Sequence, residues 1–245
     1  MAAGRLSTRK SSRVNDWVSR AHDWLLPPNC VLCGGRGAGG ADLCRECANE
    51  LPYARTACRC CAIPLPQEGV CGKCQKAPPS FDDARAVFLY REPVDHLIHV
   101  LKFNQKLYSA RLLGDLMAEH LASMQPPDVI VPVPLHSGRL RQRGFNQALE
   151  LARPISKALG VPLALRLCTR QLDTAPQTGM DAKLRRRNLK GAFAVSEVLD
   201  ALHVAIVDDV MTTGSTVEIL AQILKRAGAM HVSVWLCARV DLRGI

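Results

Sequence analysis

The sequence predicts an α/β protein with a mostly parallel sheet flanked by helices, preceded by a small cysteine-rich module that binds metal. Two observations support this prediction. Strand-like apolar runs alternate with helix-like patterns over residues 79–245, and nine of the 11 cysteines lie within residues 30–74. We therefore expect three segments: a basic tail with a short helix (1–26), a cysteine module (27–78) and a sheet domain (79–245).

The composition is that of a folded protein, with 48% hydrophobic and 22% charged residues among 245. No run approaches the roughly 18 apolar residues that a membrane-spanning helix needs, so no integral membrane segment is expected. Charges interrupt the apolar part of the first 26 residues, which makes a poor secretory signal and favours a cytoplasmic location. The net charge of +10 indicates anionic partners, either phosphates on a small ligand or a nucleic acid backbone.

The first segment begins with basic and serine-rich residues, for which we expect disorder up to about residue 13. Apolar residues then follow at helical spacing from Val14 to Leu25 and stop before Pro27 and Pro28. This pattern predicts a short helix. Packing on the protein is favoured over binding to a membrane surface.

Cysteine pairs dominate the second segment. Four CxxC pairs are separated by ten, ten and nine residues: Cys30/Cys33, Cys44/Cys47, Cys58/Cys61 and Cys71/Cys74. Because a tetrahedral Zn²⁺ takes four thiolates, the four pairs supply up to two closed sites, and a closed site holds structural rather than catalytic zinc. A disulfide framework of a secreted module is the alternative, disfavoured because no export signal precedes the cysteines.

The pairing of these cysteines stays open. The pairs can combine sequentially or interleave, and the sequence does not distinguish the two. Cys60 is one cysteine too many; Cys58 and Cys61 keep the two-residue spacing and are the expected ligands, while the role of Cys60 is unassigned. The segment has few large apolar residues, so we expect it to need the metal in order to fold.

The third segment alternates strands and helices. The expected strands are 84–90, 128–133, 161–167, 192–195, 202–207 and 231–238, and the expected helices are 94–102, 107–124, 144–159 (with a kink at Pro154) and 213–227. Sheets of this kind bind ligands beyond the carboxyl ends of their strands.

Residues 204–216 form the strongest candidate ligand-binding motif of the sequence. An apolar strand ends in two acids, Asp208 and Asp209, and a hydroxyl-rich loop then leads into a helix. The backbone amides and hydroxyl groups at the start of this helix can hold a phosphate dianion; the residues are Thr212, Thr213, Gly214, Ser215 and Thr216. The carboxylates suit ribose hydroxyls or Mg²⁺. An ordinary turn with a threonine cap is disfavoured, and the Walker A pattern is absent.

This strand, acidic pair and loop resemble the signature with which phosphoribosyltransferases bind phosphoribosyl diphosphate (PRPP). A second stretch, residues 131–136 with residues 139–147, narrows the resemblance to the ComF family, the competence protein F or GntX-like proteins. The likeness covers about residues 25–240. It implies a phosphoribosyltransferase-like domain behind an N-terminal double zinc ribbon.

The resemblance also implies roles for individual residues. Residues 212–216 would bind the 5′-phosphate, and Asp208 and Asp209 would face the ribose and a Mg²⁺ that accompanies PRPP. The turn at 133–139 would take the diphosphate, and residues 177–188 would form a mobile loop. The residues concerned are His136, Arg139, Gln177, Arg185 and Asn188. A structural packing role for His136 remains equally open.

Two functions follow from the resemblance. The first is a protein that binds PRPP or a related ribose phosphate and acts in DNA uptake, natural transformation or the use of extracellular DNA, with single-stranded DNA and DNA-uptake proteins as partners. The second is an active phosphoribosyltransferase of nucleotide or purine metabolism with no direct DNA role. A complete glutamine amidophosphoribosyltransferase is not expected, because the cysteine pairs stand where the glutamine-hydrolysing domain would be. The acceptor and the catalytic residues stay unassigned.

The charge distribution bears on a DNA role. Residues 139–190 contain 12 Lys and Arg against three acids, so +9 of the net charge of +10 lies there. The chain has only 11 Phe, Trp and Tyr residues. Any DNA contact is therefore expected to be dominated by the phosphate backbone and to depend strongly on salt.

Overall fold

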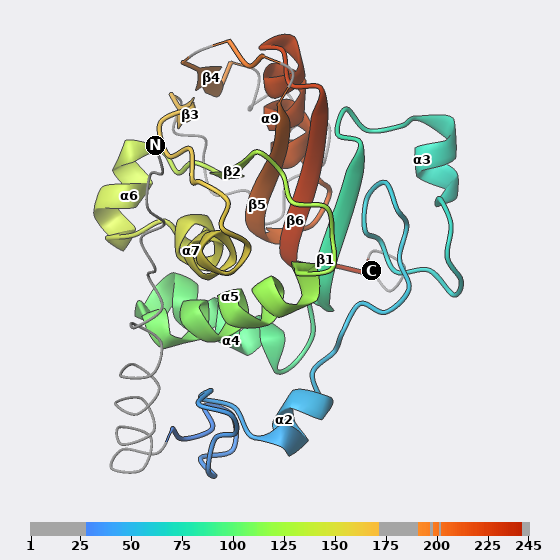
Figure 1. Ribbon diagram of the computed structural model, residues 1–245. Helices are drawn as coiled ribbons and strands as arrows, with labels where there is room; N and C mark the ends of the chain where they lie inside the picture. The colour runs from blue at the N-terminus through green and yellow to red at the C-terminus, as the bar shows by residue number, and fades with distance from the viewer. Residues whose placement is uncertain (1–27, 172–190, 197, 201, 242–245) are drawn as a thin grey trace, which may run out of the picture. The chain divides into compact units, whose positions relative to one another are not determined.

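The structure is a computed structural model that describes residues 28–171, 191–196, 198–200 and 202–241 (Figure 1). The chain divides into two compact units, Met1–Leu51 and Pro52–Ile245. The described part of the first unit holds the first two CxxC pairs and the short helix α2 (Arg45–Asn49). The helix expected within residues 14–25 lies outside the described residues.

A four-stranded parallel sheet forms the centre of the second unit. Its strands are β1 (Asp83–Leu89), β2 (Val129–Pro132), β5 (His203–Met211) and β6 (His231–Arg239), in the order β1-β6-β5-β2. The two central strands are mostly apolar and mostly buried, as expected of a parallel sheet covered on both faces. The expected fold class, a mostly parallel sheet flanked by helices, is confirmed.

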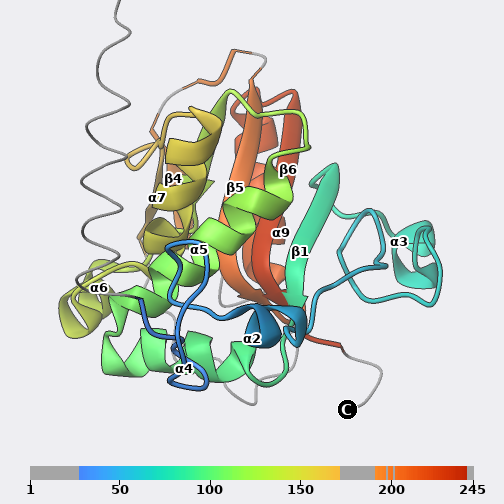
Figure 2. The same cartoon turned by 60° about the horizontal axis from the view of Figure 1, so that its bottom comes forward.

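Helices cover both faces of this sheet (Figure 2). One face carries α5 (Leu107–Leu121) and α7 (Gln147–Leu159), with α4 (Val94–Asn104) beside α5, and the other carries α9 (Ser215–Arg226). The strand order explains the division. The crossover from β1 to β2 runs in the opposite direction to the crossover from β5 to β6, so right-handed connections place their helices on opposite faces.

A close approach joins two of these helices. A Cβ added at Gly114 of α5 would lie 2.8 Å from Cγ of Pro154 and 2.9 Å from the carbonyl oxygen of Leu151, both on α7. Pro154 stands inside α7, which continues on both sides of it. Glycine therefore permits the contact that anchors α7 over α5.

Two predicted elements differ from the structure. The helix expected over 144–159 is preceded by a separate helix, α6 (Ser137–Arg143), because Gly144 adopts a φ of +82° and the Asn146 side chain caps α7 afresh. The prediction of a strand over residues 161–167 is wrong. That segment makes one bridge, between Leu163 and Ile130, and the pairing begins later, where β3 (Cys168–Arg170) meets β4 (Phe193–Val195) in an antiparallel two-stranded sheet.

The remaining described helix, α3 (Gly72–Lys76), begins after Cys71 and belongs to the last CxxC pair. Among the described residues, no helix is long and apolar enough to cross a bilayer.

Candidate functional site

The hydroxyl-rich loop after β5 lines a small open hollow of about 40 Å³. Gly214 precedes α9 with a φ of +82°, a conformation that glycine adopts without strain. The first amides of α9 have no partner inside the helix and carry the positive end of its dipole. The hydroxyls of Thr213 and Ser215 lie 2.9 Å apart in the same turn. A helix start of this kind is a common place for an anion such as a phosphate to bind.

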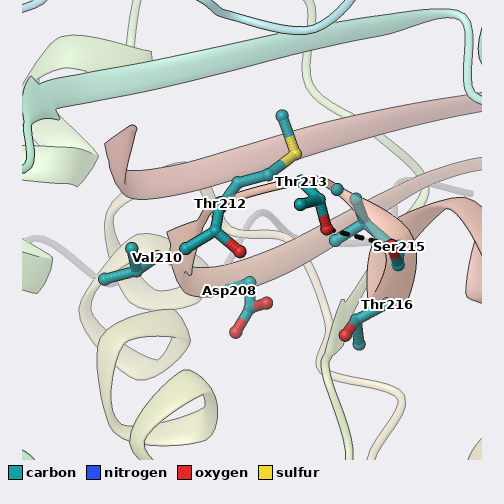
Figure 3. A pocket seen from close by; sticks show the side chains of 9 residues that line it. Asp208, Val210, Thr212, Thr213, Ser215 and Thr216 are labelled. Carbon is teal, nitrogen blue, oxygen red and sulfur yellow. Dashed lines mark hydrogen bonds between the residues drawn. The ribbon is translucent and has the colours of Figure 1, made fainter. Parts of the chain in front are cut away.

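The two acids of the motif point to different places, since successive side chains of a strand face opposite sides. Asp208 lines the hollow, and in Figure 3 its carboxylate lies beneath the loop, between the side chains of Thr212 and Thr216. Asp209 is buried away from it. Its Oδ1 accepts the amide of Val210 at 2.7 Å, and its Oδ2 forms an ion pair at 2.8 Å with Lys102.

Lys102 is a site residue that the sequence-based assignment missed. It reaches Asp209 from α4, more than 100 positions earlier in the chain, so no local pattern connects the two. Burial lowers the pKa of Lys102, but the charges of Asp209 and Asp208 outweigh burial, and the net shift of this pKa is upward. The lysine therefore stays charged and neutralises one of the two acids.

The other acid, Asp208, holds its proton unusually tightly. Burial and the neighbouring charge of Asp209 raise the pKa of Asp208 to about 7, although Lys102 and the amide of Asp209, at 2.9 Å, act against this rise. Near neutral pH this carboxyl group is therefore present in both its protonated and its ionised form. A cation arriving in the hollow would favour the ionised form.

Arg239, at the end of β6, holds the loop from behind. It is 3% exposed, and its Nη1 donates to the carbonyl oxygens of Met211 (2.9 Å), Thr212 (2.6 Å) and Val240 (2.9 Å). Its Nε donates to the carbonyl oxygen of Cys61 at 3.0 Å. One buried guanidinium thus ties the start of the loop to the third CxxC pair. The sequence analysis missed it, because Arg239 follows an apolar strand with no motif around it.

The turn expected to hold a diphosphate follows β2. The amide of Val133 donates to the carbonyl oxygen of Val207 at 2.9 Å, so this turn leaves the sheet one residue before Asp208 along β5. His136 caps α6, where its Nδ1 accepts the amide of Gly138 at 3.2 Å, which supports a structural role for that nitrogen. Arg139 is half-buried on α6. The other three expected contacts lie outside the described residues: Gln177, Arg185 and Asn188.

The eight paired cysteines form two clusters, one in each unit: Cys30, Cys33, Cys44 and Cys47, and Cys58, Cys61, Cys71 and Cys74. In each cluster the four sulfur atoms lie within 4.8 Å of one another. The pairs therefore combine sequentially, which settles the alternative that the sequence left open. The described cysteines are free, so no disulfide framework is present among them.

The sulfur geometry fits zinc. A tetrahedral site with Zn–S bonds of about 2.3 Å needs sulfur atoms about 3.8 Å apart. Cys33 and Cys44 are separated by 3.8 Å between Sγ atoms, and Cys61 and Cys71 by 3.7 Å. The amide of Cys71 also donates to Sγ of Cys58 at 3.2 Å, which stabilises a thiolate. Cys60 belongs to neither cluster.

A larger cavity of about 650 Å³ adjoins the loop and shares four lining residues with the hollow: Met211, Thr213, Gly214 and Ser215. It runs along α9 to the second cysteine cluster and is lined by apolar side chains that include Phe81, Phe193, Ile219 and Ile223. This volume is in the range of small-molecule sites.

Comparison with known proteins identifies the family. The double zinc ribbon domain matches residues 21–75. The chain is 39% identical over 204 residues to DNA utilization protein YhgH of Salmonella typhimurium, covering 80% of this chain and 90% of that protein. It is 34% identical over 224 residues to competence protein F of Haemophilus influenzae, covering 86% of this chain and 96% of that protein. The chain belongs to the ComF/YhgH family.

As the resemblance implied, the ComF/YhgH chain carries two zinc-ribbon sites, and its cysteine clusters support structural zinc. Solved structures that overlay part of it include a purine phosphoribosyltransferase from Pyrococcus horikoshii, with 20% identity, a TM-score of 0.32, and 64% of this chain and 88% of that chain covered. The allosteric regulatory enzyme of purine biosynthesis overlays with 21% identity and a TM-score of 0.35, and the overlay covers 51% of this chain and 24% of that enzyme.

Proposed function

We propose that this ComF/YhgH protein binds PRPP with Mg²⁺ at the end of β5 and takes part in the uptake or use of DNA. The observation that carries the first part is the open hollow in which the hydroxyl-rich loop and the carboxyl group of Asp208 face the same space. The second part is supported by the names of its relatives, DNA utilization protein and competence protein F.

The arrangement suits the three parts of PRPP. The 5′-phosphate would lie on the amides and hydroxyls of residues 212–216, with the ribose above Asp208. The diphosphate would lie toward the turn that follows β2, because β2 ends opposite Val207, the residue before Asp208. Arg139 and His136 belong to this turn and to α6, and a positive charge there would complement the diphosphate.

The two acids take different roles in this proposal. Asp208 is the carboxylate that would contact the ribose or the hydrated metal ion, and Asp209 is a positioning residue that holds Lys102. Mg²⁺ usually keeps several waters and takes only one or two carboxylates together with substrate phosphates, which a single ionised Asp208 satisfies. When bound, the ion would neutralise charge on the diphosphate.

Thermal unfolding of the zinc-loaded full-length protein tests this proposal. PRPP with Mg²⁺ should raise the melting temperature, since a ligand that binds only the folded state stabilises it. Asp208→Asn should abolish the shift, whereas Asp115→Asn, which changes the same charge at an exposed position of α5, should retain it. An unchanged melting temperature of the wild-type protein would refute the ligand. If the protein released diphosphate continuously with a nucleobase acceptor and did not bind DNA, a metabolic phosphoribosyltransferase would be favoured instead.

A further inference from the structure

An exposed aromatic surface lies beside the acidic pair. Phe103, the residue after Lys102 on α4, is 65% exposed, and Leu107 and Tyr108 at the start of α5 are 50% and 43% exposed. Large apolar side chains gathered at one place on the surface of a folded protein commonly mark a binding site. These three are close in sequence, at the junction of two helices.

The ring of Phe103 is oriented by its neighbours. The guanidinium carbon of Arg143, on α6, lies 5.9 Å from its centroid, and the ring of His99 lies 4.7 Å away at an interplanar angle of 42°. Arg143 is itself held by a 2.7 Å hydrogen bond to Oε1 of Gln147. Phe103 therefore presents a positioned aromatic ring to solvent beside a cation. We call Phe103, His99 and Arg143 the aromatic platform.

Basic residues predominate in the segments that form the aromatic platform, and Asp209, whose charge acts on Arg143, is paired with Lys102. Residues 96–114 and 129–149 contain no Asp or Glu. They contain six basic residues: Lys102, Lys106, Arg111, Arg139, Arg141 and Arg143. Of these, Lys106, Arg111 and Arg141 are exposed, and Arg111 forms an ion pair with Asp115. An exposed ring on helices that also carry solvent-facing cations suits a base together with its neighbouring phosphates.

We propose that the aromatic platform stacks an unpaired base of single-stranded DNA, whose phosphates contact Lys106 and Arg141. This proposal rests on the proposed role in DNA handling and gives that role a site. A free base is the weaker candidate. One stacking contact contributes about 1–3 kcal/mol, which by itself corresponds to a dissociation constant above about 1 mM. A strand adds phosphate contacts on both sides of the base, and the exposed cations supply the partners for them.

The test compares variants of the zinc-loaded full-length protein for binding a fluorescent oligothymidylate of about 20 nucleotides, followed by anisotropy at several salt concentrations. Phe103→Ala should weaken binding by about 5- to 150-fold, the loss of one stacked base. Phe103→Trp should bind within about twofold of wild type, because indole stacks equally well. Leu165→Ala is the matched control, since Leu165 is 53% exposed but lies outside the aromatic platform, and it should change nothing.

Two further arms separate stacking from charge. Phe103→Ala should leave the salt slope unchanged, whereas Arg141→Ala should reduce its magnitude by about 0.7, the value for one phosphate contact with a single strand. An abasic strand of the same length should bind Phe103→Ala and wild type equally. Thymidine monophosphate in large excess should compete poorly.

The proposal is overturned if the wild-type protein does not bind the oligonucleotide, or if Phe103→Ala binds it as tightly as wild type. It is also overturned if Phe103→Ala loses as much affinity for the abasic strand as for the normal one. Full competition by the mononucleotide would assign the aromatic platform to a free nucleotide. The proposed PRPP site is judged separately. Phe103→Ala should keep the thermal shift with PRPP and Mg²⁺ that Asp208→Asn loses, so either proposal can fail without the other.

Discussion

The ion pair between Lys102 and Asp209 offers the sharpest test of how the site is held together. Lys102→Met would remove the cation that lies 2.8 Å from Oδ2 of Asp209, where the two side chains are 23% and 6% exposed. At an effective dielectric constant of about 20, two unit charges at this distance attract each other by about 6 kcal/mol before desolvation is counted. The substitution would leave a buried carboxylate next to a second one.

The net cost is smaller than this attraction. Removing one partner of a buried pair costs about 3–5 kcal/mol, and the partial exposure of Lys102 places it near the lower end, at about 3 kcal/mol. Folded proteins are stable by only about 5–15 kcal/mol, so the loss is easily measured. For a unit of this size we expect the melting temperature to fall by about 6–12 °C.

Urea unfolding followed by tryptophan fluorescence provides the assay. Trp235 is 1% exposed on β6 and reports on the sheet once Trp17 and Trp24 are replaced by Phe. The double variant Lys102→Met with Asp209→Asn removes both charges and should recover a large part of the loss. A Lys102→Met protein within about 0.5 kcal/mol of wild type, or a double variant whose losses simply add, would refute the reasoning.

Three other predictions concern the loop and its supports. Because the pKa of Asp208 rises to about 7 on folding from 3.8, its contribution to stability is present below pH 3.8 and is lost as the pH rises through 7. Asp208→Asn should therefore be less destabilising at alkaline than at acidic pH. Calorimetry should show that PRPP–Mg²⁺ binds more tightly as the pH rises through 7, with release of a proton. If neither the stability difference nor the affinity changes with pH, the reasoning is wrong. Gly214→Ala, at a φ of +82°, should cost about 1–2 kcal/mol and abolish the thermal shift with PRPP; an unchanged shift contradicts the geometry. Cys71→Ser, which removes a ligand of the second cluster, should weaken PRPP binding through Arg239, whereas Cys44→Ser in the first cluster should not; equal effects in titration calorimetry would exclude that connection.

The sequence was most informative where the chemistry is local. A CxxC pair brings its sulfur atoms together within a few residues, so spacing alone predicted both cysteine clusters. The loop at the start of α9 is also local, and its residues line one hollow; its anion binding stays a prediction. The alternation of strands and helices likewise sufficed for the fold class. It failed at α6 and at residues 161–167, where a positive-φ glycine and pairing with a distant strand, rather than apolar periodicity, decide the structure.

Contacts between distant segments were decided only by the tertiary structure. The sequence showed two adjacent acids, but only the position of α4 shows that Asp209 forms an ion pair with Lys102 while Asp208 lines the hollow. In the same way, packing paired the cysteines sequentially and left the ring of Phe103 exposed beside a guanidinium. The physical reason is that periodicity and spacing describe the direction of neighbouring side chains, whereas an ion pair or a stacked ring depends on which helix lies against which strand.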